Sequence, residues 1–233
     1  MILAYHRVNP WYDKDALTVS PGVFKRQMEY MLGKGFISDT LEKVFRDNRI
    51  FHERYRFCIT FDDGFADNLW YALPLLETMG IKPLIFLTAG LIGTEKTLPR
   101  YGDPGRDRFL NWNEVVEMLG RGAEFGSHAL THSRLTDMNE EKLRNEIEDP
   151  KKIIEDKTGK RVDFFCYPFG DFDERIIGAV RKAGYIGAVV TPGKKDIELT
   201  RYTVHRTGIY GHNGLLIFRV KIWRGNKKIE KFY

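Results

Sequence analysis

Short apolar runs alternate with helical patterns along most of this 233-residue chain. Amphipathic stretches such as SPGVFKRQMEYMLGKG and NEEKLRNEIEDPKKIIEDKTG separate these runs and have the period of helices. Six runs are strand candidates: MILAYH, RFCITF, KPLIFLTA, AEFGSH, VDFFCYP and YIGAVVT. Apolar strands that alternate with helices form a parallel sheet, and six or seven such units are enough to close a barrel. We therefore expect a single α/β domain over residues 1–233, with functional side chains at the carboxyl ends of its strands.

Candidate capping residues and prolines indicate where two of the expected helices begin or break. Ser20 and Asn139 each precede a helical run and are expected as N-caps, and Pro21 suits the first helical position. Pro150 lies inside the second run. Because proline lacks a backbone donor and crowds the preceding turn, we expect it to kink or split that helix.

Composition excludes several classes of protein. The net charge of +5 is spread over a chain that is 30% charged, which is too mixed to indicate nucleic-acid binding. Cys58 and Cys166 lie in apolar runs and are expected as buried thiols rather than a disulfide. The first residues lack the pattern of a cleaved signal peptide, and no run approaches the ~20 apolar residues of a membrane span. These features predict a cytoplasmic enzyme.

Two adjacent carboxylates, Asp62 and Asp63, stand where the run RFCITF ends. Successive side chains of a strand point to opposite faces, so both acids can serve one site only if the strand ends there. Gly64 permits a turn, and a helical run follows with Asp67 as a candidate cap. The pair alone leaves two interpretations open, namely a functional site or a helix cap beside a solvated turn residue.

Three histidines also follow predicted strands. They are His6, His128 and His132. His128 and His132 are four residues apart, which on a helical turn places side chains ~5–6 Å apart on one face. Two imidazoles and one carboxylate such as Asp63 make a three-ligand site for a divalent ion. A lone pair of histidines at this spacing is also compatible with packing or with a solvated surface.

Three short motifs resemble those of the polysaccharide deacetylases that share the chitooligosaccharide deacetylase homology domain. The motifs are TFDDG at Thr60 to Gly64, SHALTH at Ser127 to His132 and YPFG at Tyr167 to Gly170, and the resemblance extends to about Ile209. It implies a distorted (β/α) barrel of parallel strands, expected to have seven. It also implies a hydrolase that removes acetyl groups from N-acetylated amino sugars with one divalent ion. Zinc is the expected ion, with cobalt, nickel and manganese as alternatives.

Carried over position by position, the resemblance assigns roles to the motif residues. Asp62 becomes the general base, and Asp63, His128 and His132 become metal ligands. The turn formed by Tyr167, Pro168, Phe169 and Gly170 becomes part of the substrate site.

Two features depart from the commonest family pattern. No arginine precedes YPFG, and no Leu-x-His motif lies near the carboxyl end to supply a general acid. LAYH, ending at His6, resembles that motif moved to the first strand, as in the subgroup with a circularly permuted barrel. We therefore predict His6 as general acid, with His205 as the competitor. Arg206 is predicted to point inward and steer Asp62 or a substrate oxygen; a structural salt bridge is the alternative.

The sequence says less about the substrate and the partners of the protein. Residues 89–115 are rich in Gly, Pro and charge and are predicted to form a lid, on which Tyr101 and Trp112 can stack against a sugar; Trp112 can equally serve as a helix staple. A polysaccharide and a lipid- or nucleotide-linked glycan both fit. A deformylase, another metal-dependent hydrolase and a catalytically silent glycan-binding barrel remain rival interpretations. The oligomeric state stays open.

The final segment, residues 212–233, is predicted to be a basic helix. Leu215, Phe218 and Ile222 fall at helical spacing and are followed by several cations. Two interpretations compete: the stripe lies on an anionic membrane, or it docks on the barrel and leaves the cations in water.

Overall fold

The structure is a computed structural model that describes residues 1–11, 15–46, 55–95, 107–191 and 198–230, with the side chains of 226–230 left out. All six predicted strands are present. They are β1 (Ile2–Tyr5), β5 (Arg56–Phe61), β6 (Pro83–Leu87), β7 (Glu124–Ser127), β8 (Phe164–Cys166) and β9 (Gly187–Val190). Short strands that the periodicity did not reveal are β2 (Arg7–Val8), β3 (Thr18–Val19), β4 (Ile37–Ser38), β10 (Val204–His205) and β11 (Thr207–Gly208).

The strands form a parallel barrel, as expected. Their order is β10-β9-β8-β7-β6-β5-β1-β11, with β4 beside β5, and every described pair is parallel. Only Arg206 separates β10 from β11. Residues 204–208 therefore close the barrel between β9 and β1. The path has eight strands, with β4 beside it, where seven were expected. β2 and β3 form a separate two-stranded sheet.

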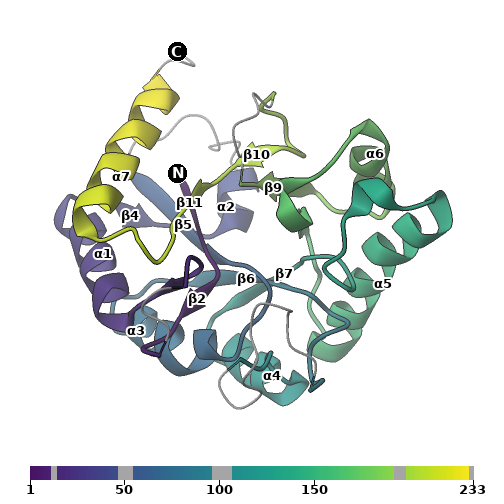
Figure 1. The fold of residues 1–233 in the computed structure, drawn as a ribbon, viewed down its shortest axis with the longest axis horizontal. Helices are drawn as coiled ribbons and strands as arrows, with labels where there is room; N and C mark the ends of the chain where they lie inside the picture. Colours follow the sequence, from purple (N-terminus) through teal and green to yellow (C-terminus); the bar gives the residue numbers. More distant parts are fainter. Residues whose placement is uncertain (12–14, 47–54, 96–106, 192–197, 231–233) are drawn as a thin grey trace.

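Helices surround the strands, as Figure 1 shows. They are α1 (Pro21–Gly33), α2 (Leu41–Arg46), α3 (Leu73–Glu77), α4 (Trp112–Gly120), α5 (Glu140–Thr158), α6 (Glu174–Lys182) and α7 (Leu215–Glu230). A π-helical turn precedes α3 at Asn68–Ala72, and 3₁₀ turns occur at Leu135–Asp137 and Pro168–Gly170. Among the described residues, no helix combines the length and apolar character needed to cross a bilayer.

Only some of the predicted helix caps and breaks are present. Asn139 caps α5 by accepting a hydrogen bond from the Lys142 amide at 3.0 Å. Pro21 occupies the first turn of α1, but the Ser20 side chain makes no capping hydrogen bond within the described residues. The Asp67 carboxylate does not cap either and is paired with buried Arg7. Of the kink or split predicted at Pro150, the split is wrong, because α5 runs through Pro150 as one helix of 19 residues.

Two apolar clusters lie on the two sides of the strands. The outer cluster joins strand residues such as Leu3 and Ile59 to the surrounding helices. The inner cluster holds alternate strand residues, including Cys58 and Phe164, together with α2. Phe45 of α2 packs against Phe164 with ring centroids 4.8 Å apart. Because Phe164 begins β8, α2 closes the amino-terminal end of the barrel and leaves the carboxyl-terminal end for the site.

Candidate active site

The predicted polar residues gather at the carboxyl ends of the strands around one cavity of about 710 Å³. His6 follows β1, Asp62 and Asp63 follow β5, His128 follows β7, and Arg206 lies between β10 and β11. The cavity lining is His6, Leu17, Asp62, Asp63, His128, Thr131, His132, Tyr167, Phe169, Gly170, Thr191, Arg206 and Tyr210. The barrel therefore brings together residues that lie up to two hundred positions apart in the sequence.

Asp63, His128 and His132 form a compact set of metal-ligand atoms. Nε2 of His128 lies 3.5 Å from Oδ1 of Asp63, and Nε2 of His132 lies 3.3 Å from the same oxygen. The ligand atoms of the three residues all lie within 4.8 Å of one another. Oδ1 of Asp63 is buried and makes no hydrogen bond to any described residue. A buried carboxylate oxygen facing two imidazole nitrogens fits a divalent cation, which would satisfy it.

The candidate ligands and their neighbours are unusual in their backbone conformation. Asp63, Ala129 and His132 have positive φ angles of 74°, 61° and 60°, and Phe169 in the YPFG turn has 61°. Such angles cost non-glycine residues about 1–3 kcal/mol each and cluster at functional sites. They also correct the expectation of a helical turn between His128 and His132. The two rings approach to 5.0 Å through left-handed residues instead.

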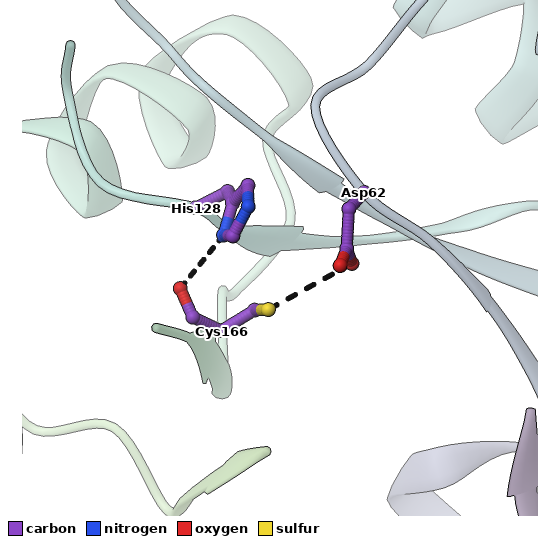
Figure 2. Close-up of side chains that lie close together, drawn as sticks. All are labelled: Asp62, His128 and Cys166. Carbon is purple, nitrogen blue, oxygen red and sulfur yellow. Dashed lines mark hydrogen bonds between the residues drawn. The ribbon is translucent and has the colours of Figure 1, made fainter. Parts of the chain in front are cut away.

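The tautomer of His128 is fixed by the strand next to it. Its Nδ1 lies 2.8 Å from the carbonyl oxygen of Cys166 (Figure 2). Burial lowers the pKa of His128 to about 4. The ring is therefore neutral at pH 7, with Nδ1 donating to the carbonyl and the lone pair of Nε2 directed at Asp63.

The Asp62 carboxylate is held in place by Arg206. The guanidinium donates two hydrogen bonds of 2.7 Å to the two carboxylate oxygens and a third of 3.0 Å to Oγ1 of Thr60. Burial raises the pKa of Asp62, but the Arg206 charge outweighs burial and brings that pKa well below its usual range. Asp62 is thus ionised, buried and oriented.

Sγ of Cys166 lies 3.7 Å from Oδ1 of Asp62 (Figure 2). The same sulfur lies 3.0 Å from Nη2 of Arg206. Asp62, His128 and Cys166 are close enough to suggest a second ligand set. Burial, however, raises the pKa of the Cys166 thiol well above 9, and both oxygens of Asp62 are already bonded to Arg206. A protonated thiol makes a poor ligand, so Asp63 with His128 and His132 is the better set.

His6 borders the cavity beside Asp62. Its Nε2 lies 3.8 Å from Oδ2 of Asp62, and its side chain is 19% exposed. The His6 carbonyl accepts a hydrogen bond of 3.0 Å from Asn68, and the following Arg7 is buried against Asp67 at 2.6 Å. The backbone of this residue is therefore fixed. His205 is not part of the described cavity lining.

The predicted substrate residues are only partly brought together. Tyr167, Phe169 and Gly170 line the cavity, whereas Pro168 and Trp112 are outside its described lining. Trp112 is turned onto the outer core at the start of α4, where Asn111 forms a capping box, so the structure favours the helix-end interpretation over a sugar platform. The central part of the predicted lid, residues 96–106 with Tyr101, lies outside the described residues.

Sequence reasoning missed four cavity residues, namely Leu17, Thr131, Thr191 and Tyr210. Thr131 lies inside the SHALTH motif, and its hydroxyl donates to buried Glu146 at 2.6 Å. Thr191 and Tyr210 follow the ends of strands β9 and β11. That position was the only feature of the sequence that could have marked them as cavity residues. Leu17 comes from the short segment before β3 and carries no polar signal.

Comparisons with known proteins agree with this geometry. The family model for polysaccharide deacetylase matches residues 52–188. YxkH of Bacillus subtilis, which bears the polysaccharide deacetylase name, is 26% identical over 211 residues, covering 89% of this chain and 70% of YxkH. A peptidoglycan-N-acetylglucosamine deacetylase of Bacillus cereus is 34% identical over 71 residues, 30% of this chain and 33% of that protein.

Solved structures share the fold. The Streptococcus pyogenes deacetylase PplD, solved in complex with acetate, superposes with a TM-score of 0.79 at 21% identity, covering 95% of this chain and 96% of PplD. The family match spans more than half of the sequence and includes all three motifs. The chain therefore belongs to the polysaccharide deacetylase family and is a carbohydrate N-deacetylase, a hydrolase of non-peptide carbon–nitrogen bonds.

Proposed function

We propose that this chain removes the N-acetyl group of an amino sugar, in a polysaccharide or in a lipid- or nucleotide-linked glycan, with the help of one divalent metal ion. The observation that carries this proposal is the presence in one cavity of a three-residue ligand set and a separately oriented carboxylate. Asp63, His128 and His132 form the set, and Asp62 is the carboxylate. An ionised base beside a metal site is the combination that amide hydrolysis by water requires.

The ligand set consists of two nitrogens and one oxygen, which favours zinc, with cobalt, nickel and manganese as alternatives. When bound, the ion would polarise the acetyl carbonyl and lower the pKa of water toward ~7. His128 contributes a neutral imidazole whose orientation is fixed by the Cys166 carbonyl. Asp63 contributes the buried oxygen that would otherwise remain without a partner among the described residues.

Asp62 is the proposed general base. It accepts a proton from water while the water oxygen bonds to the acetyl carbon. Arg206 keeps Asp62 ionised and restricts its carboxylate to one orientation. The oxyanion that develops on the acetyl group is proposed to meet a backbone amide near Tyr167, an interaction worth about 3–4 kcal/mol where such donors have been removed.

His6 is the proposed general acid. The carbon–nitrogen bond breaks as His6 gives a proton to the sugar nitrogen, so acetate and a free amine leave. This places the acid on the first strand, in line with the resemblance to the permuted subgroup. The position of His6 on the cavity, with partial exposure, supports the assignment over His205.

Phe169 is the proposed contact for the sugar ring. Its side chain is 57% exposed at the cavity edge, while its ring meets His132 at 4.7 Å and the Arg134 guanidinium at 4.8 Å. An exposed aromatic face beside the metal ligands suits the apolar face of a pyranose. The named activity of the Bacillus cereus relative supports an N-acetylglucosamine unit as the sugar.

Acetate release and metal content, measured together, test the proposal. The substrates are N-acetylglucosamine oligomers, and formate release from N-formyl analogues is assayed in parallel. Asp63→Ala, His128→Ala and His132→Ala should each lose bound metal and activity together. Asp62→Asn should keep its metal and lose ~10²–10⁴ in turnover. A purified triple variant that retains one equivalent of metal would refute the ligand set, and formate release without acetate release would refute deacetylation.

The general acid is tested with a matched pair of variants. His6→Ala should lose turnover with little change in metal content, and His205→Ala should be near neutral in rate. Loss of turnover in His205→Ala alone would return the general acid to the carboxyl-terminal part of the chain.

A further inference from the structure

Helix α7 has two apolar faces, and one of them packs on the barrel. Phe218 and Ile222 are buried, and the Phe218 ring meets Tyr30 of α1 with centroids 6.2 Å apart. Leu215 also packs on the outer core. The stripe that the sequence offered as a membrane-binding face is therefore the docking face of α7. Figure 1 shows α7 beside α1 at the edge of the barrel.

The opposite face of α7 is also apolar but points outward. Leu216 is 74% exposed, Trp223 56%, Ile217 44% and Val220 42%. At about 100° per residue, Leu216, Val220 and Trp223 lie ~140–200° around the helix from Phe218. Surface helices of globular proteins usually present polar residues in this direction. A contiguous apolar stripe with an exposed tryptophan indicates an interaction surface.

Two arginines border this outer stripe. Arg219 lies ~100° and Arg224 ~240° around the helix from Phe218, so they stand on either side of Leu216, Val220 and Trp223, with Ile217 next to Arg224 at ~260°. Both are exposed, although the Arg219 guanidinium also lies 5.4 Å from the centre of the Tyr30 ring on α1. The sequence from Leu215 to Gly225 contains no acidic residue. Lys221 does not join them, because its Nζ is turned inward and donates to the Gly208 carbonyl at 2.6 Å. The border of the stripe is therefore cationic on both sides.

We propose that this outer face, made of Leu216, Ile217, Arg219, Val220, Trp223 and Arg224, binds an anionic lipid surface with α7 lying in the plane of that surface. The apolar stripe enters the boundary between headgroups and acyl chains, where tryptophan is favoured. Each arginine meets anionic headgroups from its own side of the helix.

Charge favours lipid over a second copy of the chain. In a symmetric dimer the same face occurs on both partners. Pairing two copies of this face would bring four guanidinium groups together with no acid from the face to neutralise them. An anionic surface supplies the missing charge at each position and leaves the docked face of α7 unchanged.

Vesicle sedimentation of the intact protein tests the proposal. The probes are phosphatidylcholine vesicles with and without phosphatidylglycerol, at low and high salt. We expect the protein to pellet with the anionic vesicles at low salt, at least about tenfold more than with the neutral ones, and to be released by salt. Leu216→Ser with Trp223→Ser, and separately Arg219→Gln with Arg224→Gln, should each reduce binding by about tenfold or more.

Matched controls separate the face from general changes in charge or hydrophobicity. Val116→Ser removes an apolar side chain that is 48% exposed on α4. Lys152→Gln with Arg161→Gln removes two other exposed cations. Both controls should bind as the wild type does, and circular dichroism should show every variant folded.

Three results would overturn the proposal. They are no pelleting with anionic vesicles at low salt, equal loss of binding in the control variants, and concentration-dependent dimerisation that Leu216→Ser with Trp223→Ser abolishes while vesicles have no effect. The last result would assign the face to a second copy of the chain. None of these readouts uses deacetylase activity, so the outcome is independent of the proposed reaction.

Discussion

Breaking the buried ion pair between Arg206 and Asp62 should cost more stability than replacing both partners together. The two side chains are only 1% and 5% exposed, and they share two hydrogen bonds of 2.7 Å. Arg206→Met leaves a buried carboxylate without its partner, and Asp62→Leu leaves a buried guanidinium. The double variant removes both charges and keeps approximate side-chain volumes, which for buried pairs is often neutral or stabilising.

The expected magnitude follows from the surroundings of the pair. Removing one member of a buried pair typically costs about 3–5 kcal/mol. Asp62 also lines the cavity, where water can reach an abandoned carboxylate, so we take about 3 kcal/mol for Arg206→Met. Arg206 keeps its hydrogen bond to Thr60 when Asp62 is replaced, so Asp62→Leu should cost a similar amount. If the double variant loses about 2 kcal/mol, the coupling between the two sites is about 4 kcal/mol.

Urea unfolding of the four proteins at pH 7, followed by far-ultraviolet circular dichroism after chelation of metal, measures this coupling. The matched control is the cycle of Arg121→Met and Glu77→Leu. Those two side chains are also paired through two hydrogen bonds, of 2.8 and 2.7 Å, but are 31% and 35% exposed. Exposed pairs couple by about 0.2–1 kcal/mol. A coupling at Arg206 and Asp62 no larger than in the control would refute the reasoning.

Two further predictions concern Glu124 and Gly187, the first residues of strands β7 and β9. Burial raises the pKa of Glu124 to about 7, so its contribution to stability is present below pH 4.5 and is lost as pH rises toward 7. Glu124→Gln should therefore be more stable than the wild type above pH 7 by about 1–3 kcal/mol and equal to it in acid. The exposed control Glu95→Gln should show no such gain above pH 7. An equal free energy of unfolding for the wild type and Glu124→Gln at every pH, measured in urea, would contradict this. A Cβ at Gly187 would lie 2.0 Å from Phe45, so Gly187→Ala should cost about 1–3 kcal/mol in urea unfolding, unlike Gly178→Ala in α6, where nothing lies within 4 Å.

The barrel was predictable because its strands are buried on both faces and read as continuous apolar runs. The short strands were missed for a physical reason. Each of β10 and β11 has two residues, and Arg206 separates them, so no apolar run marks them. Residues 204–208 are strands because β9 and β1 supply hydrogen-bond partners on either side, which is information that only the closed barrel contains.

Those residues of the candidate site that directly follow strands could be predicted from the sequence. Asp62, Asp63 and His128 follow apolar strands directly, so their convergence follows from parallel topology. The helical turn expected at His128 to His132 was wrong because positive φ angles at Ala129 and His132 are not visible in residue types that rarely adopt them. Trp112 was predicted to contact a sugar, but its side chain packs on the outer core at the start of α4.

The position of Arg206 explains how this chain dispenses with an arginine before YPFG. Its backbone amide bonds to Val190 of β9 at 2.8 Å, while the next residues pair with β1. The change of partner at this residue directs the guanidinium into the barrel, where it reaches Asp62. An arginine at position 166 would compete for the same space, because Sγ of Cys166 already lies 3.0 Å from Nη2 of Arg206. A small, uncharged side chain on β8 is therefore the condition under which the closing strand can supply the positive charge that orients Asp62.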